Sequence, residues 1–184
     1  MKILLFLSLT FYTLISTSEN HFVFANAIDL ENFVDKKLYA QCVKNLPICC
    51  VDIFLYNQCN ESYLLIERLN PPAQGILWFP GGRIFKGESF FEAAIRKCKE
   101  EIGIEVKPLQ IIDVYSTIFA DSAWDCQTHT INIAVLALLP PLQQLHLNQD
   151  HGTYQWRSLN KIPENPYLNQ VYQKAIILLF NLKI

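Results

Sequence analysis

Carboxylate side chains recur at fixed intervals behind a pair of glycines in residues 79–104, FPGGRIFKGESFFEAAIRKCKEEIGI. Five residues separate Gly82 from Glu88, and the adjacent carboxylates of Glu100 and Glu101 follow near the end of the stretch. Carboxylates and the backbone carbonyls of a Gly-Gly turn are hard oxygen ligands, which suit Mg²⁺ or Mn²⁺. Such an ion keeps waters and also binds phosphate oxygens. The spacing therefore predicts a site for a divalent metal.

The element that must position these carboxylates is a helix predicted over residues 89–102. Ser89 and Glu92 have the spacing of a capping box, and Gly103 suits the left-handed residue that closes a helix. An apolar stripe at helical spacing consists of Phe91, Ile95, Cys98 and Ile102. A capped amphipathic helix with ordinary surface charges is the alternative interpretation of the same residues.

Residues outside this helix predict a sheet and two further helices. Apolar patterns predict strands over 47–57, 62–68, 109–119, 130–139 and 153–157, and helices over 29–41 and 165–182. The strand 130–139 is nearly all apolar, which favours a central position in the sheet. Strands with helices on both sides favour an α/β sandwich.

Length and composition favour a single domain that acts on a small molecule. The chain has 184 residues and is 51% hydrophobic, so it can bury a sizeable core. Its formal net charge of -2 argues against a basic face, and therefore against a nucleic acid polymer as partner. The six cysteines form no C-x-x-C pair, which argues against a structural zinc site.

The first residues of the chain differ from the rest. Lys2 precedes an apolar run from Ile3 to Ile15, and small polar residues follow, which resembles a secretory signal peptide. The run is too short to predict a stable membrane span. We therefore assign residues 1–27 to a signal-like extension and residues 28–184 to one domain. The location stays open between the cytoplasm and, if the extension acts as a signal peptide, export.

The spacing after Gly82 resembles the Nudix box, whose pattern is G-x5-E-x7-R-E-U-x-E-E-x-G-U, with U a bulky apolar residue. One specified position departs from the pattern, because Lys97 stands where the family has Glu. The resemblance implies a Nudix-type α/β/α sandwich with a mixed β-sheet. Within the box, Glu88 is expected to support the site, and Arg96 to tie the helix carboxylates together through bidentate hydrogen bonds.

Three further stretches resemble one atypical Nudix subfamily, the GDP-mannose mannosyl hydrolases. They are VDIFLYN, NPPAQGILWFPGGRIFKGESFFEAA and LNQDHGTYQW, and the similarity covers roughly residues 30–160. The resemblance implies Mg²⁺-dependent hydrolysis of a nucleotide sugar, GDP-mannose or GDP-glucose, with Mn²⁺ as the alternative ion. In this subfamily water attacks the anomeric carbon of the sugar, and GDP leaves. The resemblance also implies a homodimer.

The subfamily implies a set of metal ligands in this chain. Glu101 matches the box glutamate that binds Mg²⁺, and the carbonyl of Gly81 matches a backbone ligand. Asp150 stands where the subfamily has a glutamine ligand, and Glu100 is the adjacent box carboxylate. A site with few carboxylates and one metal would tolerate Lys97, and the charge of Asp150 would offset it.

The same resemblance implies the catalytic and substrate-binding residues. His151 matches the general base, and an imidazole can take a proton from water at neutral pH. Arg68 and Arg83 match the arginines that bind and stabilise the departing diphosphate. Asp52 matches a substrate-contacting aspartate, and Thr130 stands where the subfamily has a tyrosine near the leaving group.

Two other functions stay open from the sequence. A Nudix pyrophosphohydrolase that acts on a nucleoside diphosphate derivative is favoured by the intact pair Glu100 and Glu101. A nucleotide-sugar binding module without turnover is favoured by Lys97 and by the signal-like extension, because GDP-sugars are scarce outside the cytosol.

Overall fold

The computed structural model describes residues 34–141 and 143–184. The predicted signal-like extension, residues 1–27, and the start of the helix predicted over 29–41 lie outside the described residues. Within them, α1 (Lys36–Asn45) begins after Asp35, whose side chain accepts hydrogen bonds from two backbone amides of the first turn. The helix therefore ends four residues later than predicted.

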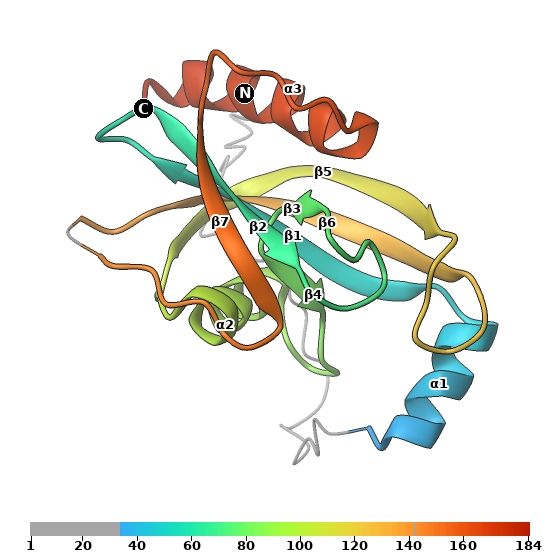
Figure 1. The fold of residues 1–184 in the computed structure, drawn as a ribbon. Helices are drawn as coiled ribbons and strands as arrows, with labels where there is room; N and C mark the ends of the chain where they lie inside the picture. Colours follow the sequence, from blue (N-terminus) through green and yellow to red (C-terminus); the bar gives the residue numbers. More distant parts are fainter. Residues whose placement is uncertain (1–33, 142) are drawn as a thin grey trace, which may run out of the picture.

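A mixed sheet forms the centre of the molecule (Figure 1). Its strands are β1 (Ile48–Asn57), β2 (Ser62–Arg68), β3 (Leu77–Trp78), β4 (Gly81–Arg83), β5 (Lys107–Phe119), β6 (Thr128–Leu138) and β7 (His151–Ser158). The order is β3-β2-β1-β6-β5, with β4 paired to β1 and β7 paired to β2. β1 and β6 are parallel, and the other pairs are antiparallel. The apolar strand β6 lies between β1 and β5, as predicted.

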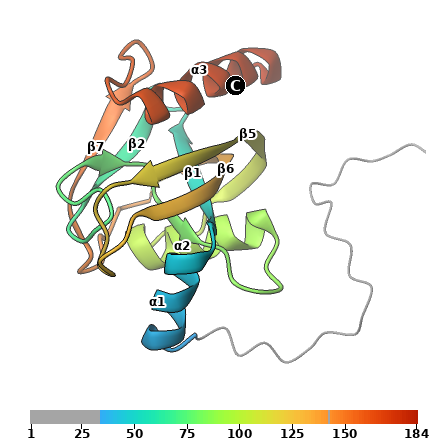
Figure 2. The same cartoon turned by 90° about the vertical axis from the view of Figure 1, so that its right-hand side faces the viewer.

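Helices cover both faces of this sheet (Figure 2). α2 (Phe90–Ile102) packs on one face through a cluster that includes Cys98 and Ile102. α3 (Pro166–Leu182) packs on the other face through a cluster that includes Val171 and Ala175. The predicted α/β/α sandwich with a mixed sheet is therefore confirmed.

The ends of α2 have the predicted local chemistry. The hydroxyl of Ser89 accepts from the amide of Glu92 at 3.2 Å, and the Glu92 carboxylate accepts from the amide of Ser89 at 2.8 Å. Gly103 has φ +73°, the left-handed conformation that glycine adopts without steric cost. This helix therefore ends directly after the carboxylates that it must position.

The sequence reasoning missed two short strands. β3 and β4 have two and three residues, which are too few to show an alternating pattern. In α3, Tyr172 is buried, whereas Leu182 lies in the last turn and is exposed. None of the helices in the described parts of the chain is long and apolar enough to cross a membrane.

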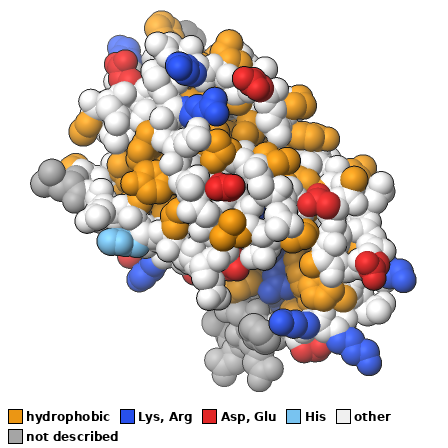
Figure 3. All heavy atoms as spheres, in the orientation of Figure 1, with side chains coloured by type: hydrophobic (Ala, Val, Ile, Leu, Met, Phe, Trp, Pro, Cys, Tyr) orange, Lys and Arg blue, Asp and Glu red, His pale blue; other side chains and the backbone are white. Residues whose placement is uncertain are grey.

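The face seen in Figure 1 mixes charged groups of both signs with apolar side chains (Figure 3). Lys and Arg side chains lie in several separate places on this face and do not form a continuous basic surface. This distribution agrees with the net charge of -2 and with a small-molecule ligand.

Candidate active site

Strand pairing brings the predicted site residues together from distant parts of the chain. β1 and β4 pair so that Asp52 lies opposite Gly81. β2 and β7 pair so that Arg68 lies opposite His151. The amide of Gly81 donates to Oε2 of Glu101 at 2.9 Å, which fixes the end of α2 against β4. Five of the predicted site residues therefore lie around the junction of these strands with α2.

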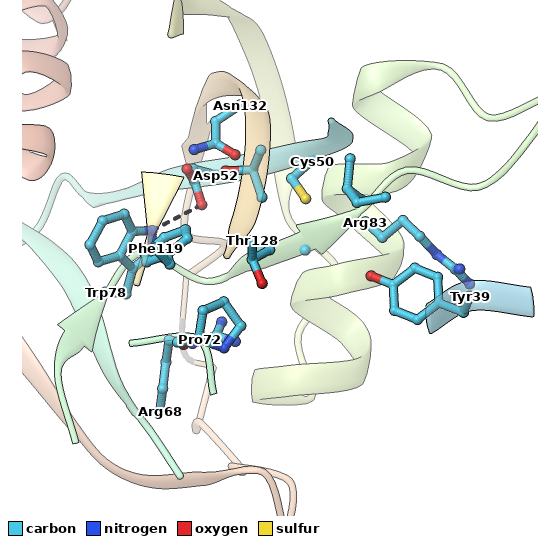
Figure 4. A pocket seen from close by; sticks show the side chains of 14 residues that line it. Tyr39, Cys50, Asp52, Arg68, Pro72, Trp78, Arg83, Phe119, Thr128 and Asn132 are labelled. Atoms are coloured by element: carbon cyan, nitrogen blue, oxygen red, sulfur yellow. Dashed lines mark hydrogen bonds between the residues drawn. The ribbon is translucent and has the colours of Figure 1, made fainter. Parts of the chain in front are cut away.

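A pocket of about 140 Å³ opens beside this junction. Asp52 and Asn132 lie on one side of it, and Arg68 and Arg83 enter from two other directions (Figure 4). Its lining consists of Tyr39, Ile48, Cys50, Asp52, Arg68, Pro72, Trp78, Gly81, Gly82, Arg83, Phe119, Thr128, Thr130 and Asn132. Carboxylate, amide, hydroxyl and guanidinium groups thus share one cavity, which suits a polar, negatively charged ligand.

Asp52 is a buried acid in the wall of this pocket. Only 5% of the residue is exposed, and its carboxylate accepts hydrogen bonds from Nε1 of Trp78 at 3.2 Å and from the hydroxyl of Tyr115. Burial raises the pKa of Asp52 from 3.8 to about 6, although the two hydrogen bonds and the charge of Arg68 oppose the rise. Asp52 can therefore accept hydrogen bonds from a ligand, and it changes charge near neutral pH.

The two arginines are held in place by different partners. Nε of Arg68 donates to the carbonyl of Pro72 at 2.7 Å, in the loop that follows β2. The guanidinium of Arg83 lies 4.5 Å from the centre of the Tyr39 ring and 5.0 Å from that of Phe85. Both contacts fix the side chain while leaving N–H groups for a ligand.

Arg96 connects α2 to the loop between β4 and α2. Its Nη2 donates to Glu88 and to the carbonyl of Arg83, each at 2.9 Å, and its Nε also binds Glu88. Its Nη1 lies 3.1 Å from both carboxylate oxygens of Glu100. Glu88 in turn accepts from the amide of Phe85 at 2.7 Å. The expected structural roles of Arg96 and Glu88 agree with these contacts.

Lys97 lies between the two carboxylates at the end of α2. Its ammonium is 2.8 Å from Oε1 of Glu101 and 3.2 Å from Oε2 of Glu100. Burial alone lowers the pKa of Lys97, but the charges of Glu101 and Glu100 outweigh burial and raise the pKa above its usual value. The lysine therefore stays charged, and it neutralises the buried Glu101.

His151 lies at the start of β7, next to Glu101. Oδ1 of Asn148 accepts from the amide of Asp150 at 3.0 Å, which identifies this atom as the amide oxygen. The same oxygen is 2.8 Å from Nδ1 of His151, so Nδ1 carries the proton and Nε2 has the lone pair. Nε2 lies 3.9 Å from Oε2 of Glu101. The imidazole thus presents a basic nitrogen to the carboxylate end of α2.

Burial lowers the pKa of His151, and the charges of Arg68 and Lys97 lower it further, while Glu101 opposes them. Because the lowered pKa favours the neutral ring, His151 can accept a proton at neutral pH. Electrostatics and geometry therefore agree with the role expected for this residue.

The carboxylate of Asp150 contacts Asn70, and not Glu101 or His151. Its exposed carboxylate accepts from Nδ2 of Asn70 at 2.8 Å, and its carbonyl accepts from the amide of Leu69 at 2.9 Å. Asp150 directly precedes His151 in the chain, but its carboxylate is bound to Asn70 in the loop that follows β2.

A family model of the NUDIX domain matches residues 49–179 of the chain. The protein belongs to the Nudix family. The matched range includes the whole sheet except Ile48, the Nudix box helix α2, His151 and most of α3. It leaves out α1, which contributes Tyr39 to the pocket.

Two curated proteins show partial similarity to this Nudix domain. The low-salt glycan biosynthesis protein Agl8 of Haloferax volcanii is 38% identical over 64 residues, which are 35% of this chain and 40% of that protein. The ADP-ribose pyrophosphatase of Methanocaldococcus jannaschii is 34% identical over 105 residues, which are 57% of this chain and 59% of that protein. The chain thus spans less than two thirds of the length of either relative.

Solved Nudix structures share the fold. The MutT protein of Methanosarcina mazei has a TM-score of 0.59 at 24% identity, and it covers 70% of this chain and 92% of its own. The NUDIX domain of Shewanella oneidensis NrtR, in complex with ADP ribose, has a TM-score of 0.58 at 19% identity, with coverage of 79% and 99%. At these identities the similarity supports the fold alone.

Nudix hydrolases generally use divalent metals such as Mg²⁺. In residues 34–141 and 143–184, no three His, Cys, Asp or Glu side chains gather closely enough to hold a metal ion. Mg²⁺ is commonly held by one or two carboxylates, with waters and substrate phosphates as its other ligands. Glu101 meets that need, since its Oε2 has a second lone pair beside the one used by Gly81. The residues present at the end of α2 therefore fit a Mg²⁺ ion that Glu101 holds together with waters and substrate phosphates.

Several pocket residues were missed by the sequence reasoning. Asn132 and Thr117 are buried polar residues that are hydrogen-bonded to each other at 3.1 Å, and Asn132 lines the pocket. Tyr115 supports Asp52 from β5, and Tyr39 reaches the pocket from α1. Polar residues inside otherwise apolar strands were the available signal for Asn132, since a buried amide needs a partner. Thr130, which replaces the tyrosine of the subfamily, is buried and lines the pocket.

Proposed function

We propose that this Nudix protein is a metal-dependent hydrolase of a nucleoside diphosphate sugar. GDP-mannose or GDP-glucose would be cleaved to GDP and free sugar by water attack at the anomeric carbon. The observation that carries the proposal is the position of His151. Its basic nitrogen lies 3.9 Å from the buried Glu101, beside a polar pocket that two arginines enter.

The pocket chemistry supports a ligand with both a diphosphate and a hydroxyl-bearing ring. Arg68 and Arg83 supply guanidinium groups, which bind phosphate oxygens in bidentate geometry. Asp52, Asn132 and Thr130 supply acceptors and donors that suit sugar hydroxyls. We therefore place the diphosphate at the arginines and the sugar near Asp52.

His151 would act as the general base. It takes a proton from water at Nε2, the new bond forms between the water oxygen and the anomeric carbon, and the bond from that carbon to the diphosphate oxygen breaks. The leaving oxygen takes the electron pair, and Arg68 and Arg83 stabilise the charge that develops there. Asn148 orients the ring through Nδ1.

The metal would be Mg²⁺, with Mn²⁺ as the alternative ion. It would be held by Glu101, with the carbonyl of Gly81 and the carboxylate of Asp150 as further proposed ligands and Glu100 beside them. Bound there, it would supply positive charge to the diphosphate.

A second candidate function is hydrolysis at phosphorus. The pair Glu100 and Glu101 is intact, and the Methanocaldococcus jannaschii relative is an ADP-ribose pyrophosphatase. This reaction would give a nucleoside monophosphate and a sugar phosphate.

Product analysis in ¹⁸O-labelled water separates these functions. The full chain would be incubated with GDP-mannose, GDP-glucose or ADP-ribose and Mg²⁺, and the products read by mass spectrometry. We expect unlabelled GDP and labelled sugar. A labelled phosphate in a monophosphate product would instead support attack at phosphorus. Binding without turnover would support the nucleotide-sugar binding module.

The proposal includes a domain boundary and an oligomeric state. We propose that residues 28–184 act as one domain and that two chains form a homodimer. Light scattering of the purified protein measures the second point directly, and a monomer mass would contradict it.

A further inference from the structure

Lys97 occupies a position that is shaped for a cation. Its ammonium lies between two adjacent carboxylates, 2.8 Å from Glu101 and 3.2 Å from Glu100. The Lys97 side chain is 17% exposed and that of Glu101 is 5% exposed. A buried carboxylate without a counter-charge is costly, so Glu101 requires a cation at this position.

Gly82 makes room for this arrangement. A Cβ atom added at Gly82 would lie 2.9 Å from Cε of Lys97 and 3.4 Å from its Nζ. The lysine stem therefore runs directly against the backbone of a residue that lines the pocket. The ammonium is held at the edge of the ligand cavity rather than in open solvent.

The other oxygens of the two carboxylates are also in use. Arg96 binds both oxygens of Glu100, and the amide of Gly81 binds Oε2 of Glu101. A divalent ion between Glu100 and Glu101 would thus have to displace Lys97. Displacement would bring a divalent charge close to the ammonium, and that repulsion is strong at a partly buried site.

We propose that Lys97 is a built-in counter-ion that fills the cation position between Glu100 and Glu101 and limits the site to one divalent ion. The carboxylate of Glu100 then binds Lys97 and Arg96 instead of a metal. The single ion binds to Glu101 on the side that faces His151. The inference rests on the proposed function only in treating these carboxylates as cation ligands. It identifies Lys97 as the residue that sets the metal stoichiometry.

Mn²⁺ binding to the full chain without nucleotide tests this inference, with free Mn²⁺ read by electron paramagnetic resonance. We expect at most one Mn²⁺ per wild-type chain. Lys97→Glu should bind at least one more, because it turns the counter-ion into a further carboxylate ligand. Lys97→Gln should bind Mn²⁺ at least about tenfold more tightly than wild type, since the repulsion is gone.

Lys99→Glu is the matched control. Lys99 lies on the same helix, its side chain is 70% exposed, and its ion-pair partner is Glu105 at 4.0 Å. The variant makes the same change of charge without touching Glu100 or Glu101. Its Mn²⁺ stoichiometry should equal that of the wild type.

Two results would overturn the inference. One is a wild-type chain that binds two or more Mn²⁺ ions. The other is equal Mn²⁺ stoichiometry and affinity in the wild type and in whichever Lys97 variant keeps the circular dichroism of the folded protein. Neither result bears on which bond of the nucleotide sugar is cleaved, so the inference and the proposed function fail separately.

Discussion

Asp52 should make the stability of this protein depend on pH in an unusual direction. Most native carboxyls have a lowered pKa, but burial raises that of Asp52 from 3.8 to about 6. Between these two values the unfolded chain releases the proton before the native protein does. Rising pH therefore favours unfolding in this window, and the loss is complete above it.

The size of the effect follows from the shift. A rise from 3.8 to about 6 corresponds to about 3 kcal/mol of unfolding free energy, at about 1.4 kcal/mol per pKa unit. Asp52→Asn removes the titration. Its amide can accept from Trp78 or Tyr115 but not from both, which lowers stability by about 1 kcal/mol at every pH. Because this loss is the same at every pH, it does not alter the slope of the unfolding free energy against pH.

Urea unfolding of the wild type and of Asp52→Asn, from about pH 4 to about pH 7, measures the slope. We expect the stability of the variant relative to the wild type to rise by about 2.5 kcal/mol across this range, because the unfolded carboxyl is already partly ionised at pH 4. Asp113→Asn is a control that should not show this slope. Although burial opposes it, Lys174 and Gln170 lower the pKa of Asp113 below 3.8, so Asp113 is ionised in both states over most of this range and the stability of that variant relative to the wild type should stay nearly constant. A flat or falling difference for Asp52→Asn would refute the reasoning.

Four further predictions concern the site and the residues that support it. His151→Ala should lower kcat about 10²- to 10⁴-fold, the range of a lost general base, while calorimetry shows unchanged nucleotide affinity. In the wild type, the acid limb of the pH–rate profile should lie below pH 6.5, because burial lowers the pKa of His151. Arg96→Lys should lower the free energy of unfolding by about 1–3 kcal/mol in urea, since lysine cannot bind Glu88, Glu100 and the Arg83 carbonyl together. Asp150→Gln keeps an oxygen for Asn70 but removes the charge, so titration calorimetry should show weaker Mg²⁺ binding, and an unchanged affinity would remove Asp150 from the ligand set.

The parts of the fold that depend on local chemistry could be predicted from the sequence. The cap at Ser89, the helix end at Gly103 and the central position of β6 each follow from a few neighbouring residues. β4 could not be predicted in the same way. Its three residues form a strand only because β1 lies alongside, and that pairing depends on the whole sheet.

In the candidate site, too, single residues could be predicted from a local motif, but the contacts between distant residues could not. The Nudix box spacing identified Glu101, but its contact with His151 joins residues 50 positions apart. The support of Asp52 by Tyr115 spans 63 positions, so it follows from the order of the strands and not from a motif. The orientation of the Lys97 side chain could not be predicted from the sequence either, because a lysine on a helix can extend into solvent as readily as toward a carboxylate.

The contacts of α2 separate the structural part of the Nudix box from the part that departs from the pattern. Arg96 connects Glu88, Glu100 and the carbonyl of Arg83, and its guanidinium lies 3.8 Å from the centre of the Phe85 ring. None of these contacts involves Lys97 directly. Arg96, and not Lys97, therefore makes the hydrogen bonds that tie α2 to the loop between β4 and α2. Under the role proposed for Lys97, a lysine at this position would change the cations near the pocket while Arg96 still holds that loop.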